Sequence, residues 1–256
     1  MISKPVDPDP LRHPDGILPP DEVHVWQVDL VAWEKAAGSL LFEQLDPEEQ
    51  ARAERFKFPA PRNQYVISRA LLRRALASYL KIEAHEVRFR ATANGKPELS
   101  ESSDLRFNLS HTQGVTVFAI TRRRQVGIDV ERIRQDTNVM ELAERFFSAP
   151  EVEWLRSQAA SEHLSSFFTC WTAKEAYIKA QGEGLSLPLD SFGVLPIPGT
   201  TGLQLKVYAD PKESERWSMW RLDLGSDLRS ALAVEGESYK VRLGQWPLPL
   251  SEDCKV

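Results

Sequence analysis

This 256-residue sequence lacks several features that define other protein classes. It has no run of about 18 apolar residues, so we expect no membrane-spanning helix and no membrane partner. Its first residues lack the charged-then-apolar order of a secretory signal peptide. Only two cysteines are present, Cys170 and Cys254, and their separation does not resemble a paired metal motif. These absences favour a cytoplasmic protein in a reducing compartment.

An excess of positive charge is also absent, because the formal net charge is −5. This balance argues against a dedicated nucleic-acid-binding protein. The charge is uneven, however, since residues 51–90 contain ten Lys or Arg and three acidic side chains. A basic region in an acidic chain suggests an anionic small ligand or an acidic partner. A solvated helix face explains the same pattern equally well.

Helix and strand patterns occur in both halves of the chain, although no sequence repeat connects the halves. The hydrophobic periodicity of helices occurs at 46–58, 61–80, 138–158 (with a break at 148–150) and 161–184. The alternation typical of strands occurs at 21–30, 105–110, 115–120, 126–133, 203–209, 216–224 and 230–236. We expect 115–120 and 126–133 to form a hairpin through the segment TRRRQ.

This order of elements predicts an α+β protein made of two halves of comparable size. A Pro-rich extended arm occupies residues 1–20, and the first α+β half follows at 21–125. The second α+β half is expected at 126–244, with a tail at 245–256.

The segment QVGIDVERI places two carboxylates on one face of a short strand. Val126, Ile128 and Val130 alternate with Asp129 and Glu131. Because successive side chains of a strand point to opposite faces, the two acids lie side by side, roughly 7 Å apart along the strand. Like charges at this spacing need a compensating group.

The helix at 161–184 contains a second unusual carboxylate. Phe168, Trp171, Glu175 and Ile178 lie within one narrow stripe of the helix, so Glu175 falls on the apolar face. Pairing with Lys179 one turn later is the simplest explanation. An exposed pair of this kind contributes only about 0.3–0.5 kcal/mol, which is too little to offset burial of a carboxylate.

A divalent cation would compensate all three carboxylates at once. Asp129, Glu131 and Glu175 are hard oxygen donors, and no sulfur or histidine cluster accompanies them, which favours Mg²⁺ or Mn²⁺. Mg²⁺ commonly bridges phosphate oxygens, so a phosphate-bearing substrate follows, with Lys179 neutralising further charge. The pattern alone does not distinguish phosphoryl transfer, nuclease chemistry and a structural metal site.

Four segments carry a more specific resemblance. They are NGKP (94–97), FNLSH (107–111), GIDVERI (127–133) and WTAKEAYIKAQGEGLSLPLDSF (171–192). In this order and spacing they closely resemble the Sfp-type 4′-phosphopantetheinyl transferases, over about residues 52–235. The resemblance implies a monomer of two similar halves related by pseudo-twofold symmetry, with coenzyme A in the cleft between them. It implies transfer of phosphopantetheine to a serine of an apo acyl or peptidyl carrier protein, with release of adenosine 3′,5′-bisphosphate.

The resemblance also implies roles for individual residues. Asp129, Glu131 and Glu175 would hold the metal against the coenzyme A pyrophosphate. Glu175 would accept the serine proton, and Lys179 would stabilise charge on the bridging oxygen. The coenzyme A contacts would come from Arg52, Lys96, Ser110, His111, Lys174 and Lys179.

Two positions depart from the family pattern. Relatives carry a basic residue where this chain has Glu49, and some carry a small hydroxyl residue where it has Tyr65. Arg62 or Arg69 could therefore replace a missing cation at the nucleotide end.

Two functions of other classes compete with the transferase. A metal-dependent nuclease also uses an Asp-x-Glu pair and a later lysine, but the net charge of −5 counts against it. A non-catalytic module that binds carrier proteins would keep the fold without turnover. The presence of all three carboxylates and of Lys179 weakens that alternative.

Overall fold

The computed structural model of the chain describes residues 17–34, 41–135, 137–182, 184–237 and 239–247. Most of the expected Pro-rich arm (1–16), the tail beyond 247 and Cys254 lie outside the described residues. Within these ranges, each helix is too short or too polar to cross a membrane.

The first sheet has the strand order β11-β1-β5-β4. Its strands are β1 (Glu22–Asp29), β4 (Leu105–Thr112), β5 (Val115–Arg122) and β11 (Lys240–Gln245). The helices of this half are α1 (Leu30–Glu34), α3 (Pro47–Glu54) and α4 (Pro59–Leu80). A separate hairpin of β2 (Phe89–Ala91) and β3 (Pro97–Leu99) encloses the NGKP turn.

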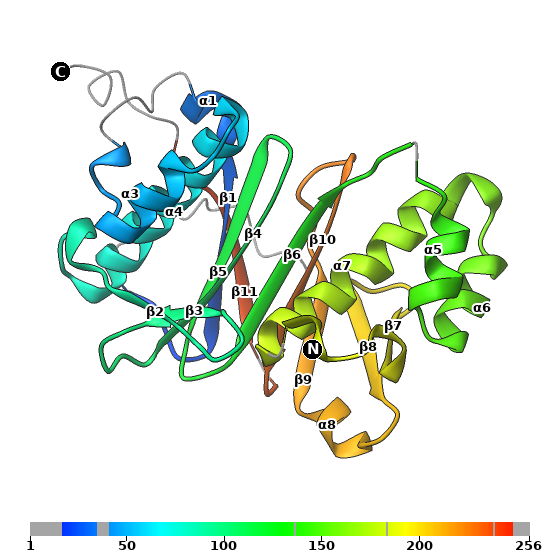
Figure 1. The fold of residues 1–256 in the computed structure, drawn as a ribbon. Coiled ribbons are helices and arrows are strands. Elements are labelled where there is room, and N and C mark those ends of the chain that lie inside the picture. The colour runs from blue at the N-terminus through cyan, green and yellow to red at the C-terminus, as the bar shows by residue number, and fades with distance from the viewer. Residues whose placement is uncertain (1–16, 35–40, 136, 183, 238, 248–256) are drawn as a thin grey trace.

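The second sheet has the strand order β6-β10-β9-β8-β7. Its strands are β6 (Val126–Arg132), β7 (Phe192–Pro196), β8 (Gly202–Val207), β9 (Trp217–Arg221) and β10 (Leu228–Glu235). The helices of this half are α5 (Val139–Phe146), α6 (Ala149–Ser157), α7 (His163–Gln181) and α8 (Pro211–Glu215). Figure 1 shows α3 and α4 beyond the first sheet and α7 along the second, while β4 and β6 face each other in the middle.

Capping groups mark the ends of several helices, although α3 ends at Glu54 and not at residue 58 as the sequence pattern predicts. Asp46 and Glu49 form a capping box at the start of α3, and Ser148 and Glu151 form another at the start of α6. Helix α7 ends at Gly182, whose φ of 77° is a left-handed conformation that glycine adopts without strain.

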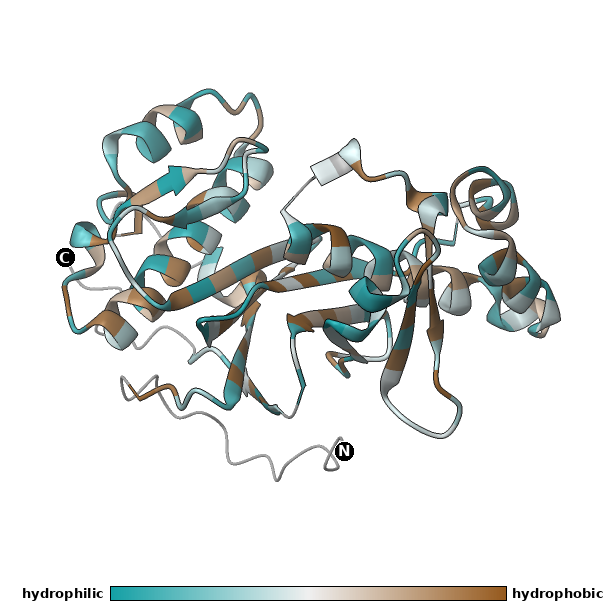
Figure 2. Cartoon of the chain, turned by 90° about the horizontal axis from the view of Figure 1, so that it is seen from below, coloured by the Kyte–Doolittle hydropathy of each residue, from teal (hydrophilic) through white to brown (hydrophobic). Residues whose placement is uncertain are grey.

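Strand alternation divides the interior into layers. One apolar cluster lies between α4 and the first sheet, and another lies between α7 and the second sheet. A third joins the two sheets face to face and includes Val126, Ile128 and Val130 of β6. Figure 2 shows the resulting brown and teal bands that alternate along the strands. The α+β fold class is therefore confirmed, the two sheets are consistent with two halves, and the polar face of β6 is turned toward α7.

Two expectations about the sheets are wrong. Strands β5 and β6 do not form a hairpin, because β5 pairs with β1 and β4 whereas β6 pairs with β10. The TRRRQ segment instead carries the chain from one sheet to the other. Residues 240–244 were assigned to the second half and no strand was expected there, but they belong to β11, which pairs in parallel with β1 of the first sheet. Both differences arise from long-range pairing, which local periodicity does not encode.

Candidate active site

A glycine on β6 brings α7 close enough to build the site. A Cβ at Gly127 would lie 2.0 Å from the carbonyl oxygen of Ala176 and 2.4 Å from the nitrogen of Ala180. Only glycine fits at this distance, since real Cβ atoms do not approach backbone so closely. The turn of α7 that carries Glu175 and Lys179 is therefore placed beside the polar face of β6.

Asp129 is the centre of the site, and only 4% of it is exposed. Its Oδ1 accepts hydrogen bonds from the Lys179 ammonium at 2.6 Å and from the Ser110 hydroxyl at 2.7 Å. The Lys179 ammonium also donates to the Ser110 hydroxyl at 3.0 Å. Three expected site residues from β4, β6 and α7 thus meet at one point. The second oxygen, Oδ2, is buried without a partner among the described residues.

Glu131 and Glu175 lie near this centre and repel its charge. Burial raises the pKa of Glu131, and the negative charges of Asp129 and Glu175 raise it further. Burial also raises the pKa of Glu175, again with help from Asp129, while Lys179 opposes the shift. Glu131 and Glu175 therefore lie in an electrostatic environment, shared with Asp129, that disfavours the charged forms of the two glutamates.

The carboxylates of the site are suitable ligands for a divalent cation, but in this structure they are not arranged as a complete metal-binding site. Among the described residues, no group of three His, Cys, Asp or Glu side chains is arranged as a metal site. The partnerless Oδ2 of Asp129 and the mutual repulsion of the carboxylates are both features that a hard cation would relieve.

His111 projects from the end of β4 toward α4. Its Nδ1 lies 2.7 Å from the side-chain nitrogen of Gln64. Because an amide nitrogen only donates, Nδ1 accepts, and the neutral ring carries its proton on Nε2. Burial lowers the pKa of His111, with a smaller contribution from the positive charge of Lys179. The ring is thus held as a neutral hydrogen-bond donor. Gln64 was missed from the sequence, because nothing local connects it to the FNLSH segment.

A cavity of about 970 Å³ opens in the first half. It is lined by Arg52, Tyr65 and Arg69, with Gly95 of the NGKP turn at its edge. The Arg52 guanidinium lies 5.3 Å from the centre of the Tyr65 ring. Arg62 is not among the lining residues and instead covers the ring of Phe42 at 5.2 Å. Arg52 therefore remains a candidate ligand, whereas Arg62 does not.

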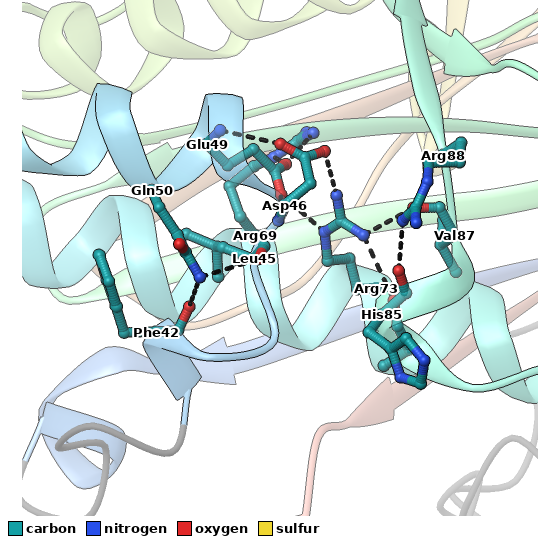
Figure 3. A network of polar contacts seen from close by, with 11 residues as sticks. Phe42, Leu45, Asp46, Glu49, Gln50, Arg69, Arg73, His85, Val87 and Arg88 are labelled. Carbon is teal, nitrogen blue, oxygen red and sulfur yellow. Dashed lines mark hydrogen bonds and ion pairs between the residues drawn. The ribbon is translucent and has the colours of Figure 1, made fainter.

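The departure at Glu49 has a structural explanation. Glu49 is buried and accepts hydrogen bonds from Arg69 at 2.5 Å and from Arg73 at 2.6 Å. Arg73 also pairs with Asp46 and donates to the carbonyl of Val87 at 2.6 Å. Figure 3 shows this network, in which Arg73 points toward both acids. Arg69 lines the cavity, but Glu49 neutralises part of its charge.

Two lysines expected to contact coenzyme A are occupied elsewhere. Lys174 is fully buried, and its ammonium donates to Glu151 at 2.6 Å and to the carbonyl of Phe192 at 2.7 Å. It faces away from Glu175 because consecutive helix residues are rotated by about 100°. The structure therefore contradicts the expectation for Lys174.

Lys96 connects the halves of the molecule. Its ammonium donates to the carbonyl of Ala180 at 3.0 Å, and to Val126 and Gln125 at 3.3 Å each. Burial lowers the pKa of Lys96 to about 8. Its ammonium is directed at oxygens of the inter-half junction, so in this structure Lys96 is a bridge and not a free phosphate ligand.

Comparison with known proteins agrees with this arrangement. Residues 26–123 match a family described as 4′-phosphopantetheinyl transferase, N-terminal, and residues 125–236 match the 4′-phosphopantetheinyl transferase superfamily. The 4′-phosphopantetheinyl transferase HetI of a Nostoc species is 36% identical over 88% of this chain and 92% of its own length. The transferase psf-1 of Bacillus pumilus is 35% identical over 69% of this chain and 77% of its own.

The transferase Sfp of Bacillus subtilis is 32% identical over 59% of this chain and 66% of its own length. These relatives are transferases, and HetI matches 88% of this chain, so the matches favour a transferase over the nuclease and the non-catalytic module. The chain belongs to the 4′-phosphopantetheinyl transferase family of enzymes.

Proposed function

We propose that this enzyme transfers the 4′-phosphopantetheine group from coenzyme A to a serine hydroxyl of an apo acyl or peptidyl carrier protein. Adenosine 3′,5′-bisphosphate is the second product, and Mg²⁺ or Mn²⁺ is required. The enzyme works as a cytoplasmic monomer. One observation carries the proposal: Asp129, Ser110 and Lys179 meet beside Glu131 and Glu175, in a chain of this family.

Coenzyme A fits the two parts of the site in one orientation. Its nucleotide end lies in the cavity of the first half, where Arg52 and Arg69 supply positive charge. The Nε2–H group of the neutral His111 ring donates to a phosphate at the end of β4. The diphosphate then reaches Lys179 and Ser110, which puts the pantetheine arm over the second half.

The carboxylates of the site suit a magnesium ion that contacts the diphosphate. Asp129, through its partnerless Oδ2, Glu131 and Glu175 would hold the ion. When bound, Mg²⁺ neutralises charge on the phosphate oxygens and on the carboxylates. Without it, the same three carboxylates would repel the substrate.

The chain's own residues supply the proton transfer and the charge stabilisation. Glu175 accepts the proton of the carrier serine, directly or through one water molecule. The serine oxygen bonds to the β-phosphorus as the bond from that phosphorus to the bridging oxygen breaks. Lys179 stabilises the negative charge that this oxygen acquires.

Mass spectrometry of apo carrier proteins tests the proposal. Incubation with the enzyme, coenzyme A and Mg²⁺ should increase the carrier mass by one phosphopantetheine group, and chelation of the metal should prevent it. Fatty acid, polyketide and nonribosomal peptide carriers should be compared, since the site does not select among them. Absence of the mass increase on every carrier would overturn the proposed reaction, and full transfer in excess chelator would overturn the metal requirement.

A further inference from the structure

The two sheets meet at β4 and β6, each of which lies at the edge of its own sheet. Backbone pairing uses only one edge of each strand, because β4 pairs with β5 and β6 pairs with β10. The other edge of β6 would present unpaired N–H groups, which are costly when buried and invite wrong pairing. The structure satisfies them in an unusual way.

Side chains of β4 accept the N–H groups along that edge of β6. The Asn108 Oδ1 accepts from Ile128 N at 2.9 Å. The Thr112 Oγ1 accepts from Arg132 N at 3.2 Å. Between them, the Ser110 hydroxyl oxygen lies 3.4 Å from Val130 N. Each pair is separated by 20 residues, so the two strands run parallel in one fixed register.

The side chains of β4 meet the N–H groups of β6 because both repeat every second residue. Side chains on one face of a strand recur every second residue, and so do the N–H groups on one edge of a strand. Asn108 and Thr112 therefore meet alternate amides without distortion of either strand. A slip to the next equivalent pairing would move β6 by two residues, or roughly 7 Å.

Further contacts hold both ends of the β4–β6 junction. Near its start, the Lys96 ammonium donates to the carbonyl of Val126 at 3.3 Å. Near its end, the Arg132 guanidinium donates to the carbonyl of Gln113 at 3.0 Å. The register is thus specified over the full length of β6.

The junction passes through the active site. Ser110 takes part in both, since the same hydroxyl that faces Val130 also donates to Asp129. The residue after Ser110 is His111, and β6 carries Glu131 one residue beyond Val130. The register between β4 and β6 therefore sets how far the phosphate-binding side of the first half lies from the carboxylates of the second.

We propose that Asn108 and Thr112 are positioning residues that fix this register and thereby align the two parts of the coenzyme A site. They touch no reacting atom and act through Ser110, His111 and Asp129. The identity of the ligand rests on the proposed function, but the register itself does not.

The variant Thr112→Val tests the proposal, since it removes the acceptor at nearly constant volume and Thr112 is only half-buried. Asn108→Leu is the equivalent change at the other end. Thr112→Ser retains a hydroxyl and should recover function. Thr121→Val is the matched control, because the Thr121 hydroxyl donates to the carbonyl of Glu22 within the first half, at 3.3 Å.

Coenzyme A would span both halves, whereas adenosine 3′,5′-bisphosphate would occupy only the first. We expect Thr112→Val and Asn108→Leu to lower kcat/KM for coenzyme A about tenfold, the effect of a small misplacement of reacting groups. The affinity for the bisphosphate, measured by titration calorimetry, should stay unchanged. Thr121→Val should alter neither quantity.

Three results would overturn the proposal. They are an unchanged kcat/KM for coenzyme A in Thr112→Val, an equal loss in kcat/KM for coenzyme A and in affinity for the bisphosphate, and no recovery of kcat/KM in Thr112→Ser. If the wild-type enzyme transfers no phosphopantetheine, the proposed function fails. Amide hydrogen exchange then tests the β4–β6 register independently of the reaction. Thr112→Val should accelerate exchange at Arg132 and Val130, whereas Thr121→Val should not. Unchanged exchange in Thr112→Val would contradict the register.

Discussion

A nearly buried carboxylate needs compensation, and Asp129 receives it on only one oxygen. Lys179 and Ser110 both bind Oδ1, while Oδ2 has no partner among the described residues. An unpaired buried oxygen is costly, so its retention favours a ligand at that position. Glu131 and Glu175 add negative charge at the same place, which makes a cation the ligand of choice.

Glu175→Gln should greatly slow transfer and stabilise the metal-free protein. Loss of the proton acceptor should lower kcat by about 10²–10⁴-fold. Because the folded protein raises the pKa of Glu175, ionisation of this group costs stability as pH rises above the ordinary glutamate range. In chelator, Glu175→Gln should therefore have a higher Tm than wild type near pH 8, and the difference should vanish below about pH 4.5.

Thermal unfolding across this pH range, together with the mass-shift assay, measures both effects. Glu153→Gln, at an exposed position of α6, is the control and should change neither. Turnover of Glu175→Gln at the wild-type rate would remove Glu175 from the chemistry. A Tm difference independent of pH would contradict the electrostatic explanation.

Arg52→Ala should weaken coenzyme A binding without slowing the chemical step. Arg52 lines the cavity of the first half, whereas Arg62 lies against Phe42 outside it. We expect Arg52→Ala to raise KM for coenzyme A about tenfold at constant kcat, since a lost ground-state contact acts on binding. Steady-state kinetics of Arg52→Ala and Arg62→Ala provide the comparison. A larger KM effect from Arg62→Ala, or a fall in kcat alone for Arg52→Ala, would reverse the assignment.

Periodicity predicted part of this site. Alternation in β6 indicates that Asp129 and Glu131 share a face, and the helical period places Glu175 and Lys179 on one side of α7; the structure agrees with both. Periodicity could not reveal that Lys174 pairs with Glu151, because the choice of a buried partner depends on the packing of α6 against α7.

At the scale of elements, Glu49 belongs to the packing of α3 on α4. It neutralises Arg69 and Arg73, and Arg73 has no exposed surface. Glu49→Lys, which introduces the basic residue that the family resemblance leads one to expect, should therefore not create a phosphate ligand. It should destabilise the protein by about 3–5 kcal/mol, since it leaves a buried arginine facing another cation.

Urea unfolding measures this loss for Glu49→Lys. Glu48→Lys, one residue earlier and outside the network of Figure 3, is the matched control and should cost far less. Equal stability of the two variants would show that the network contributes little.

Gly127→Ala should separate α7 from β6. The added methyl group would lie 2.0 Å from the carbonyl oxygen of Ala176, so the helix has to move. We expect a loss of about 3 kcal/mol or more in unfolding free energy, at the upper end of overpacking effects. Transfer activity of the folded fraction should also fall, because Glu175 and Lys179 move with the helix.

Gly95→Ala provides the comparison for this prediction. Gly95 has open space around it but a φ of 82°, so its substitution should cost only about 1–2 kcal/mol of backbone strain. Full activity and stability in Gly127→Ala would mean that the contact between α7 and β6 does not set the site.

Elements with local signals were predictable, and elements with remote partners were not. Capping residues and apolar periodicity located α3, α4, α6 and α7. The hairpin expected between β5 and β6 was wrong, because two adjacent strands can enter different sheets. Strand β11 does alternate, with Val241 and Leu243 between polar residues, but its partner β1 lies more than 200 residues away, and a local pattern does not identify that partner.

At the scale of the whole molecule, three connections hold the halves together. The sheets share an apolar layer, the chain returns through β11 to the first sheet, and β4 binds the edge of β6. The NGKP turn adds a polar contact, because Asn94 donates to the carbonyl of Gly182 at 3.1 Å and Lys96 donates to Ala180 at 3.0 Å. Both carbonyls belong to the C-terminal end of α7, which attracts cations and donors.

Lys96→Met should weaken this junction in a way that depends on pH. Burial lowers the pKa of Lys96 to about 8 in the folded protein, below the value of about 10.4 for a free lysine. Between these values the unfolded chain binds one more proton than the folded chain, so the contribution of Lys96 to stability increases as pH rises. Wild type should therefore gain stability over Lys96→Met between pH 7 and pH 10, as measured by urea unfolding. For Lys57→Met, at an exposed position of the first half, the stability difference from wild type should stay constant over this pH range. A constant difference for Lys96→Met as well would mean that its ammonium is solvated and does not join the halves.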